Sequence, residues 1–453
     1  MILPGVRVQI TTCCLPALAV MLYGAQAPGS IVLTHVAVVD VATGTLARNR
    51  TVTLVGDRIR SVSDGDTSIP PGARVLDAAG KFLLPGLWDM HVHLSYARSS
   101  ALPAFVANGV THVRDIGSRL AEIDHWRGEI AAGSLIGPTI VRAGPMLNGQ
   151  ESNRYQLAVT TAADAAASVR ALHKAGVDFI KVHRRTSREA YFAVAEQAAR
   201  LSLPLAGHVP MTVTPVEASS AGHRTFEHAI TLFEGTFAAK LAESELPAAI
   251  AAWRRSTAAP ELFATLVRNG TILDPTLVAL RRVNAWLENP VDPRDKYMAA
   301  SALREAADYL KPLRDSAHKV LAVRRALARE VEAVVGDMHR AGVRQIAGTD
   351  VSFTLLHPGF SLHDELQALV DVGLPPADAL RAATVNAARL FPTLNAGEVL
   401  AGKRADLVLL DGNPLETIRH VSRIRAVIVG GRLFDRAGLD RLLADAAAMA
   451  ALN

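Results

Sequence analysis

Eight short apolar segments recur along the central part of the chain, with longer stretches rich in Ala, Arg and Glu between them. The expected strands cover residues 82–90, 110–115, 138–144, 178–182, 203–208, 224–228, 271–277 and 344–350. Segments such as 187–201 and 363–373 have the periodicity of amphipathic helices. Eight strands separated by helices is the number that a closed (β/α)₈ TIM barrel requires. The sequence therefore predicts an α/β fold centred on such a barrel, over residues 83–390.

β-Branched runs with turn residues flank this region on both sides, over residues 31–77 and 405–435. Short alternating runs of this kind are typical of small antiparallel sheets. We expect one small β-sandwich domain formed from both termini, residues 28–82 and 391–453, with a helix at the C-terminal end. Two separate β modules are the alternative. The long gaps at 229–270 and 278–343 are expected to hold extra helices, which could form a lid.

The first 27 residues have the features of an export signal. Arg7 precedes an uncharged, mostly apolar stretch at 11–23, and Ala25-Gln26-Ala27 has the small-x-small pattern of a cleavage site. A stretch of 13 residues is too short to span a bilayer, which takes ~20, and no later segment is long and apolar enough. We expect a periplasmic or secreted protein without a stable membrane span. A buried N-terminal strand is the alternative.

Both cysteines, Cys13 and Cys14, lie inside this predicted signal. If the signal is removed after Ala27, the mature chain has no thiol, which excludes disulfides, thiolate catalysis and Cys-ligated metal sites. Lipidation at Cys13 or Cys14 is a second way to process this segment.

The chain has 453 residues, half of them apolar, which excludes a disordered or collagen-like protein. Its net charge of +5 comes from 48 basic and 43 acidic residues without a basic run. Nucleic-acid binding needs a basic stripe on one face, so no nucleic-acid partner is expected. The expected partner is a small-molecule substrate, and a homo-oligomer is compatible with the sequence.

Six residues of metal-ligand type lie at the ends of the predicted strands. They are His91, His93, Lys181, His208, His228 and Asp350. His91 and His93 are two residues apart on an extended chain, so their side chains point the same way. In a parallel barrel the carboxyl ends of all strands open on one face, where catalytic groups gather. The pattern predicts one polar site at that face, because six unpaired polar groups in a core would be costly.

The motifs around these residues, HVH after LLPG-W-D and then IK, GH, EH and GTD, resemble the amidohydrolase superfamily, specifically its imidazolonepropionase-like and prolidase-like branch. Residues 396–415 resemble that family's return into the small β domain. The resemblance extends over nearly the whole mature chain. It implies a metal-dependent hydrolase that acts on carbon–nitrogen bonds.

The resemblance further implies two divalent metal ions, usually zinc. His91, His93 and Asp350 would hold the first ion, His208 and His228 the second, and Lys181 would bridge them as a carbamate formed with CO₂. An ammonium group cannot bind a cation, and the apolar neighbours of Lys181, one of only eight lysines, are expected to lower its pKa. A lysine paired with a nearby carboxylate is the alternative.

The implied reaction is hydrolysis of an amide bond, in a dipeptide or an N-acyl amino acid, by a metal-bridging hydroxide. Metal coordination lowers the pKa of water from ~15.7 towards ~7, and Asp350 would be the catalytic residue that carries the proton to the leaving amine. The chain lacks G-x-S-x-G, G-x-G-x-x-G and G-x-x-x-x-G-K-[ST] motifs, which excludes α/β-hydrolase, Rossmann and P-loop sites.

Loops after the strands are expected to select the substrate. The candidate substrate-binding residues are Tyr96, Arg154, His183 and Arg184, with Arg114, Asp115, Arg185 and the segment 148–155 also in reach. Related sequences often have Gly-Gly-His where this chain has Asn148-Gly149-Gln150, so detailed specificity does not transfer. His223 and His363 are interpreted as structural or surface histidines.

Three other functions stay open. A lactonase or another hydrolase of cyclic amides or esters has the same superfamily chemistry. A mononuclear deaminase is disfavoured, because a carbamylated lysine has no role there. A catalytically silent barrel that serves as a binding module is the third, and the intact set of six ligands argues against it.

Overall fold

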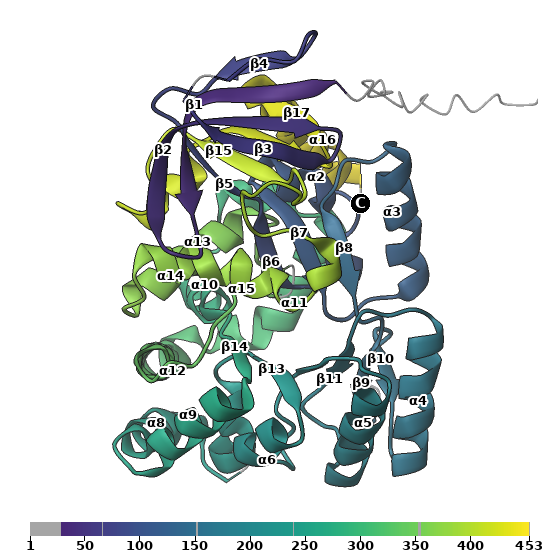
Figure 1. The fold of residues 1–453 in the computed structure, drawn as a ribbon. Helices are drawn as coiled ribbons and strands as arrows, with labels where there is room; N and C mark the ends of the chain where they lie inside the picture. Colours follow the sequence, from purple (N-terminus) through teal and green to yellow (C-terminus); the bar gives the residue numbers. More distant parts are fainter. Residues whose placement is uncertain (1–28, 66, 151–152, 239, 352–354, 453) are drawn as a thin grey trace, which may run out of the picture.

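Strands from both ends of the chain lie side by side in one sheet (Figure 1). The computed structural model describes residues 29–452, apart from 66, 151–152, 239 and 352–354. The sheet contains β1 (Ser30–Asp40), β2 (Thr45–Val55), β3 (Arg58–Asp64), β4 (Arg74–Asp77), β5 (Phe82–Pro85), β15 (Leu407–Leu410), β16 (Ile424–Val429) and β17 (Arg432–Asp435). Its order is β17-β16-β15-β5-β1-β2-β3, and β4 pairs with β1. The prediction of a β-rich domain formed from both termini is confirmed.

The two ends meet in the antiparallel pair of β5 and β15, where Phe82 lies opposite Leu410 and Pro85 opposite Leu407. A separate apolar core fills this domain and takes residues from both ends, among them Leu33, Leu83 and Leu409. Because each end contributes part of the same core, neither end buries its apolar residues without the other.

Parallel strands form the central part of the chain. They are β6 (Leu87–Val92), β7 (Val110–Asp115), β8 (Thr139–Arg142), β9 (Met146–Asn148), β10 (Gln156–Ala158), β11 (Ile180–Val182), β12 (Leu205–Gly207), β13 (His223–Glu227) and β14 (Ile272–Asp274). Two hydrogen-bonded groups result, β6-β7-β8 and β10-β9-β11-β12-β13-β14. All their pairs are parallel, as in the predicted TIM barrel.

Residues 345–351 close the barrel between its last and first strands. Gln345 forms a parallel bridge with Leu273 of β14, and Val351 forms one with Val92 of β6. The strand predicted over 344–350 is thus present only as these two bridges. The φ of Asp350 is +73°, in the left-handed region where a regular strand cannot continue.

The strand predicted over 82–90 is divided at Gly86 into β5, which joins the terminal sheet, and β6, which begins the barrel. Gly86 lies so close to β7 that a Cβ atom at this position would be 2.0 Å from Oγ1 of Thr111. The predicted strand contains Pro85-Gly86 at this point, a pair typical of turns, but the sequence does not show that its two halves belong to different sheets.

Helices surround the barrel strands, apart from the last helix of the chain (Figure 1). The helices are α1 (Leu94–Ala97), α2 (Ala101–Ala107), α3 (Leu120–Ala132), α4 (Ala162–Lys174), α5 (Arg188–Arg200), α6 (Pro215–Ser220), α7 (Thr231–Phe233), α8 (Leu246–Arg254), α9 (Ala258–Asn269), α10 (Leu277–Glu288), α11 (Ala300–Asp315), α12 (Ala317–Arg340), α13 (Phe360–Asp371), α14 (Pro376–Ala382), α15 (Val385–Ala388) and α16 (Arg436–Leu452). The last helix, α16, packs against α2 and against β16 and β17 of the terminal sheet. The two long gaps hold helices, as expected. In α5, the side chain of Ser187 caps the first turn by accepting a hydrogen bond from the amide of Ala190.

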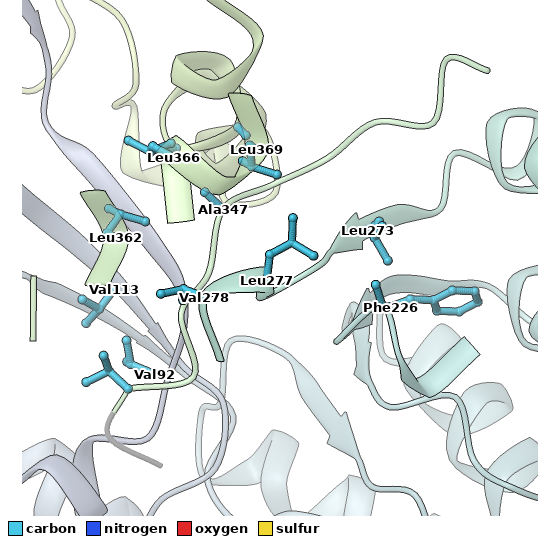
Figure 2. Packing of buried hydrophobic residues seen from close by; sticks show 14 of the residues in the cluster. Val92, Val113, Phe226, Leu273, Leu277, Val278, Ala347, Leu362, Leu366 and Leu369 are labelled. Atoms are coloured by element: carbon cyan, nitrogen blue, oxygen red, sulfur yellow. The ribbon is translucent and has the colours of Figure 1, made fainter. Parts of the chain in front are cut away.

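Helices α10 and α13 are held against the strands by a continuous apolar contact (Figure 2). Leu362, Leu366 and Leu369 are spaced four and three residues apart, so they share one face of α13. Leu277 at the start of α10 is equally buried. This packing holds the start of α10, which follows β14, in a fixed position relative to β6. Both segments border the site that is described next.

None of the described helices combines the length and the hydropathy needed to cross a bilayer. The predicted export signal, with its cleavage site at Ala27 and its two cysteines, lies outside the described residues.

Candidate metal centre

Two imidazoles from the first barrel strand face the carboxylate of Asp350. His91 lies in β6 and His93 directly follows it. Their Nε2 atoms are 3.5 and 3.2 Å from Oδ1 of Asp350. On the opposite edge of each ring, Nδ1–H donates a hydrogen bond, from His91 to Glu227 at 3.0 Å and from His93 to the carbonyl of Gly117 at 3.1 Å.

This arrangement leaves an unshared electron pair on each Nε2. A neutral imidazole that donates from Nδ1 can only accept at Nε2, and an ionised carboxylate oxygen can also only accept. The two Nε2 atoms and Oδ1 of Asp350 are thus three hydrogen-bond acceptors that face one another without a donor. Such an arrangement costs free energy when the atoms are buried. A cation among them converts that repulsion into coordination. The nitrogen and oxygen donors of His91, His93 and Asp350 suit zinc.

His208 and His228 extend the cluster on the other side of His91. Their ring centroids are 4.8 Å apart, and those of His91 and His228 are 4.5 Å apart. One ligand atom from each of His91, His228 and Asp350 fits within 4.8 Å of the others. Within the described part of the chain, Nδ1 of His208 is buried without a hydrogen-bond partner. His208 and His228 are therefore further candidate metal ligands beside His91.

Lys181 lies in β11 beneath the histidines and is 1% exposed. Its Nζ has neither a hydrogen-bond partner nor an ion pair within the described ranges, so the predicted alternative of a carboxylate-paired lysine does not describe it. Burial lowers the pKa of Lys181 to about 8. An unpartnered ammonium in a dry site is costly, whereas the neutral amine is the form that reacts with CO₂.

Burial also keeps the histidines neutral, which is the form that binds metals. It holds the pKa values of His91 and His208 well below the ordinary value and lowers the pKa of His228 to about 4. The charge of Lys181 lowers all three further.

Backbone strain is concentrated at the site. His228, Thr276 and Asp350 have φ values of +60°, +47° and +73°, although such values are uncommon for residues other than glycine. Thr276 shares a 2.7 Å hydrogen bond with Nδ1 of His228. Strained residues persist only where their surroundings hold them, and they cluster at functional sites.

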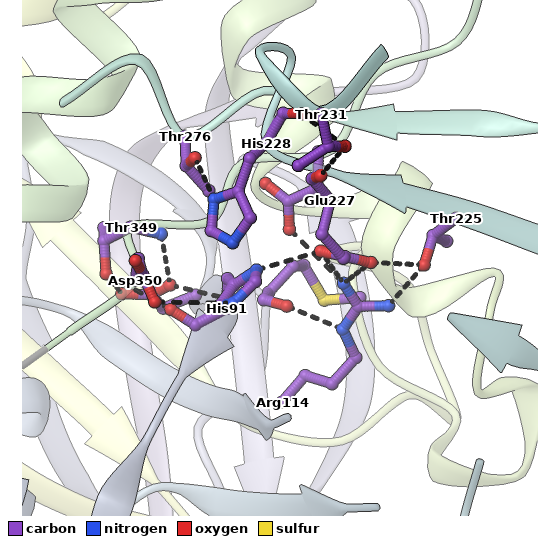
Figure 3. A network of polar contacts seen from close by, with 12 residues as sticks. His91, Arg114, Thr225, Glu227, His228, Thr231, Thr276, Thr349 and Asp350 are labelled. Carbon is purple, nitrogen blue, oxygen red and sulfur yellow. Dashed lines mark hydrogen bonds and ion pairs between the residues drawn. The ribbon is translucent and has the colours of Figure 1, made fainter. Parts of the chain in front are cut away.

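A charged network lies directly under the metal ligands (Figure 3). Arg114 donates to both carboxylate oxygens of Glu227, at 2.8 and 2.9 Å, and to Asp274 at 3.3 Å. Glu227 in turn accepts from His91. All of these residues are buried. Burial and the neighbouring Glu227 raise the pKa of Asp274, so the network has one cationic group balanced mainly by Glu227.

Asp89 ties the first strand to the segment that carries Asp350. Its carboxylate accepts hydrogen bonds from the amide and hydroxyl of Thr349, at 3.0 and 2.7 Å, and from the amide of His91 at 3.2 Å. Gly348 lies in the same contact, and a Cβ atom there would be 2.4 Å from Oδ2 of Asp274. The HVH and GTD motifs are thus held together by direct side-chain contacts.

A cavity of about 590 Å³ opens above the ligands. His93, His208, His228 and Asp350 form its floor, and α11 contributes part of its wall through Glu305 and its neighbours. The insertion helix therefore covers the site, as the lid interpretation of residues 278–343 expected.

Of the predicted substrate-binding residues, Tyr96, His183 and Arg184 line this cavity. Arg154 does not line it: its guanidinium lies over the ring of Tyr155, 4.9 Å from the centroid, and 3.7 Å from Glu305. Arg185 does line it.

Four other residues considered from the sequence do not line the cavity. Arg114 and Asp115, considered for the substrate loops, are buried below the cavity. His223 shares a 3.1 Å hydrogen bond with the hydroxyl of Tyr191, and His363 donates to the carbonyl of Asn108 at 2.9 Å.

Sequence reasoning did not single out Glu227 and Asp274. Glu227 is the first residue of the EH motif and ends β13, and Asp274 ends β14. The strand-end criterion that selected the candidate ligands would therefore have found both. Arg114 also ends a strand, but nothing in the sequence shows that it points inward.

Comparisons with known proteins identify the family of this chain. The model of the Amidohydrolase family matches residues 82–434. An adenine deaminase of Klebsiella pneumoniae is 28% identical over 426 residues, which cover 91% of this chain and 57% of that protein. An adenine deaminase of Rhizobium johnstonii is 26% identical, with 94% and 60% covered. This chain spans about 57–60% of the length of these relatives.

Several solved structures are similar to this chain over most of its length. A candidate prolidase from Bifidobacterium longum is 25% identical with a TM-score of 0.68, and the match covers 92% of this chain and 99% of that one. A bottromycin amidohydrolase has a TM-score of 0.74 at 24% identity, with 94% and 91% covered. A Xaa-Pro dipeptidase has a TM-score of 0.67 at 19% identity, with 90% and 100% covered. The last two show the shared fold alone. From its family match and its structural neighbours, this chain belongs to the amidohydrolase family, in the prolidase-like branch of the superfamily.

Proposed function

We propose that this chain, a metal-dependent hydrolase of carbon–nitrogen bonds by its family and its site, cleaves the amide bond of a small substrate that carries a carboxylate, a dipeptide or an N-acyl amino acid. One observation carries the proposal. The amine of Lys181 is buried without a hydrogen-bond partner among the described residues, on a strand of the same barrel whose His208, His228 and Asp350 line the cavity.

The residues fit two divalent ions, with zinc as the first choice. His91, His93 and Asp350 would hold one, His208 and His228 the other, and a carbamate on Lys181 would lie between them. Bound ions would supply Lewis acidity towards the scissile carbonyl and a water molecule of lowered pKa.

The chain's own groups perform the remaining tasks. Attack of water forms a C–O bond and breaks the C–N bond, so one proton must leave the water and one must reach the amine. Asp350 lies at the cavity floor and can accept the first and deliver it to the leaving nitrogen. The cationic side chain of Arg185 on the cavity wall can orient a substrate carboxylate, and α11 limits the access of bulk water.

Deamination of adenine is the second candidate, because the matched relatives from Klebsiella pneumoniae and Rhizobium johnstonii are named for it. It also breaks a C–N bond but releases ammonia from a neutral purine, which has no carboxylate to pair with Arg185. A carboxylate-bearing amide fits the cavity wall better.

The test is a screen of the zinc-loaded protein against dipeptides, N-acyl amino acids, lactones and adenine, repeated with Lys181→Ala. We expect hydrolysis of amides that is lost in the variant. Release of ammonia from adenine as the main activity, or equal turnover by Lys181→Ala, would contradict the proposal.

The predicted periplasmic or secreted location is a further proposal, supported by the apolar stretch and small-x-small pattern of the first 27 residues. N-terminal sequencing of the exported protein tests it, with Pro28 as the expected first residue.

A further inference from the structure

A second cavity, of about 470 Å³, adjoins the metal centre. His208, His228, Tyr309 and Asp350 line both this cavity and the one described above. The ligands therefore lie at a junction, with one space on each side. Volumes of this size each accommodate part of a small organic ligand.

The two spaces differ in chemistry. The second lies between α10 and α11, and its wall is formed largely by Ile230, Ala279, Leu280, Val283, Leu310 and Leu313. Arg324 also lines it, but its guanidinium already donates to Asn284 at 3.2 Å and lies 3.7 Å from Glu243. We refer to this second cavity as the apolar cavity. The first has amide and guanidinium groups on its wall, from Asn148, Gln156, Arg184 and Arg185, and we refer to it as the polar cavity.

Among the described residues, Arg185 is the cation of the polar cavity that forms no ion pair. Its side chain is exposed and forms no ion pair with any described residue, while its backbone amide is fixed by a 3.1 Å hydrogen bond to Oδ1 of Asn148. Arg184 is already 3.4 Å from the carboxylate of Glu234. A substrate carboxylate therefore has one guanidinium available to it in this cavity.

Among the residues that the structure describes, neither cavity has a spare carboxylate for an ammonium group. Besides Asp350, the described lining residues include two acids, Glu305 and Glu234. Glu305 is 3.2 Å from Arg98, and Glu234 is 3.4 Å from Arg184. The free amino group of a dipeptide in the apolar cavity would lie next to hydrocarbon without a counter-ion, which is costly.

We propose that the substrates are N-acyl amino acids with a large apolar acyl group, rather than dipeptides with a free amino terminus. The acyl group occupies the apolar cavity, the scissile carbonyl lies at the junction, and the carboxylate of the leaving amino acid faces Arg185. This inference rests on the proposed function and names its substrate class.

The first experiment uses the zinc-loaded wild-type protein and acyl series, from acetyl to decanoyl, on glycine, leucine and proline. We expect kcat/KM to rise about fourfold for each methylene that enters the apolar cavity. A leucyl dipeptide should be a poorer substrate than its N-acetylated form. A flat acyl series, or equal turnover of the free and acetylated dipeptides, would overturn the inference while leaving amide hydrolysis in place.

A pair of variants on α10 locates the acyl site. Ala279 is half-buried on the cavity wall, so Ala279→Trp should fill the cavity and abolish the chain-length dependence. Ala285 is exposed on the same helix and does not line the cavity, so Ala285→Trp is the matched control and should keep the wild-type series. Identical series for the two variants would contradict the assignment.

Binding gives a readout that does not depend on turnover. By calorimetry, the decanoyl amino acid should bind at least tenfold more tightly than the acetyl one to the wild-type protein, and this difference should disappear in Ala279→Trp. If no amide is hydrolysed but this difference is present, the proposed function fails and the apolar site stands. If amides are hydrolysed and the difference is absent, the apolar site fails alone.

Discussion

Glu227 accepts a hydrogen bond from Nδ1 of His91 at 3.0 Å, and this contact turns the other ring nitrogen of His91 towards Asp350. Glu227 is held in place by Arg114, which donates to both of its carboxylate oxygens. A carboxylate in this position fixes the tautomer of a metal-binding histidine and increases its basicity.

Glu227→Gln should therefore weaken zinc binding by roughly 10- to 100-fold while the chain still folds, since Asp274 also contacts Arg114. Competition with a chromogenic chelator measures the affinity. Glu305→Gln is the matched control, because Glu305 lines the polar cavity without contacting a metal ligand, and it should leave the zinc affinity unchanged. An unaltered affinity in Glu227→Gln would show that this contact does not tune the site.

Lys181→Met tests what the buried amine does for the protein. The substitution keeps the volume of the side chain and removes an amine that has no described partner, so the metal-free protein should be as stable as the wild type or more stable. The same variant should bind fewer than two zinc ions per chain and lose roughly a hundredfold or more in activity.

Thermal unfolding and elemental analysis give the two readouts for Lys181→Met. If Lys181 had a structural ion pair instead, the metal-free variant would unfold at a lower temperature and its zinc content would be unchanged.

Gly348→Ala should disrupt the metal centre by steric contact. The added Cβ would be 2.4 Å from Asp274 and 2.6 Å from Cβ of His91, both fixed in the core, so we expect a loss of about 1–3 kcal/mol in the free energy of unfolding and reduced zinc binding. Gly128→Ala on α3 meets no atom within 4 Å and should instead stabilise the protein by about 0.5–1 kcal/mol. Urea titration of both variants measures the difference.

Glu365 on α13 makes stability depend on pH. Burial raises its pKa from 4.5 to about 8, although the amide of Val278 donates to it at 2.7 Å. The folded state binds this proton more tightly than the unfolded state, so the contribution of Glu365 to stability is fully present below pH ~4.5 and is lost as the pH rises towards ~8.

Glu365→Gln removes that dependence. The unfolding temperature of the variant relative to wild type should rise from pH 5 to pH 8, corresponding to a gain on the order of a few kcal/mol. The exposed Glu196→Gln should show a difference that is constant with pH and within about 0.5 kcal/mol. A pH-independent difference for Glu365→Gln would show that this carboxyl is ionised in the folded protein.

The strand-end criterion selected the candidate metal ligands because ligand type and strand position can both be read from the sequence. His91, His208 and Asp350 come from distant segments, and only the closure of the barrel brings them together. The same criterion covered Glu227 and Asp274, but their role depends on the inward direction of Arg114, which has no signature in the chain.

Packing between distant segments explains the other differences. The division of residues 82–90 at Gly86 depends on the close approach of Thr111, which no local pattern reports. The separation of the space above the ligands into a polar and an apolar cavity depends on how α11 lies against α10. A helical pattern predicts that such helices exist, but not which side chains of each line a cavity.

The most direct measurement is a crystal structure of the zinc-incubated protein with anomalous data collected at the zinc edge. The account predicts two anomalous peaks, one among His91, His93 and Asp350 and one beside His208 and His228, with additional density for a CO₂ unit on Nζ of Lys181. Peaks elsewhere, or one ion beside an unmodified Lys181, would contradict the paired metal centre.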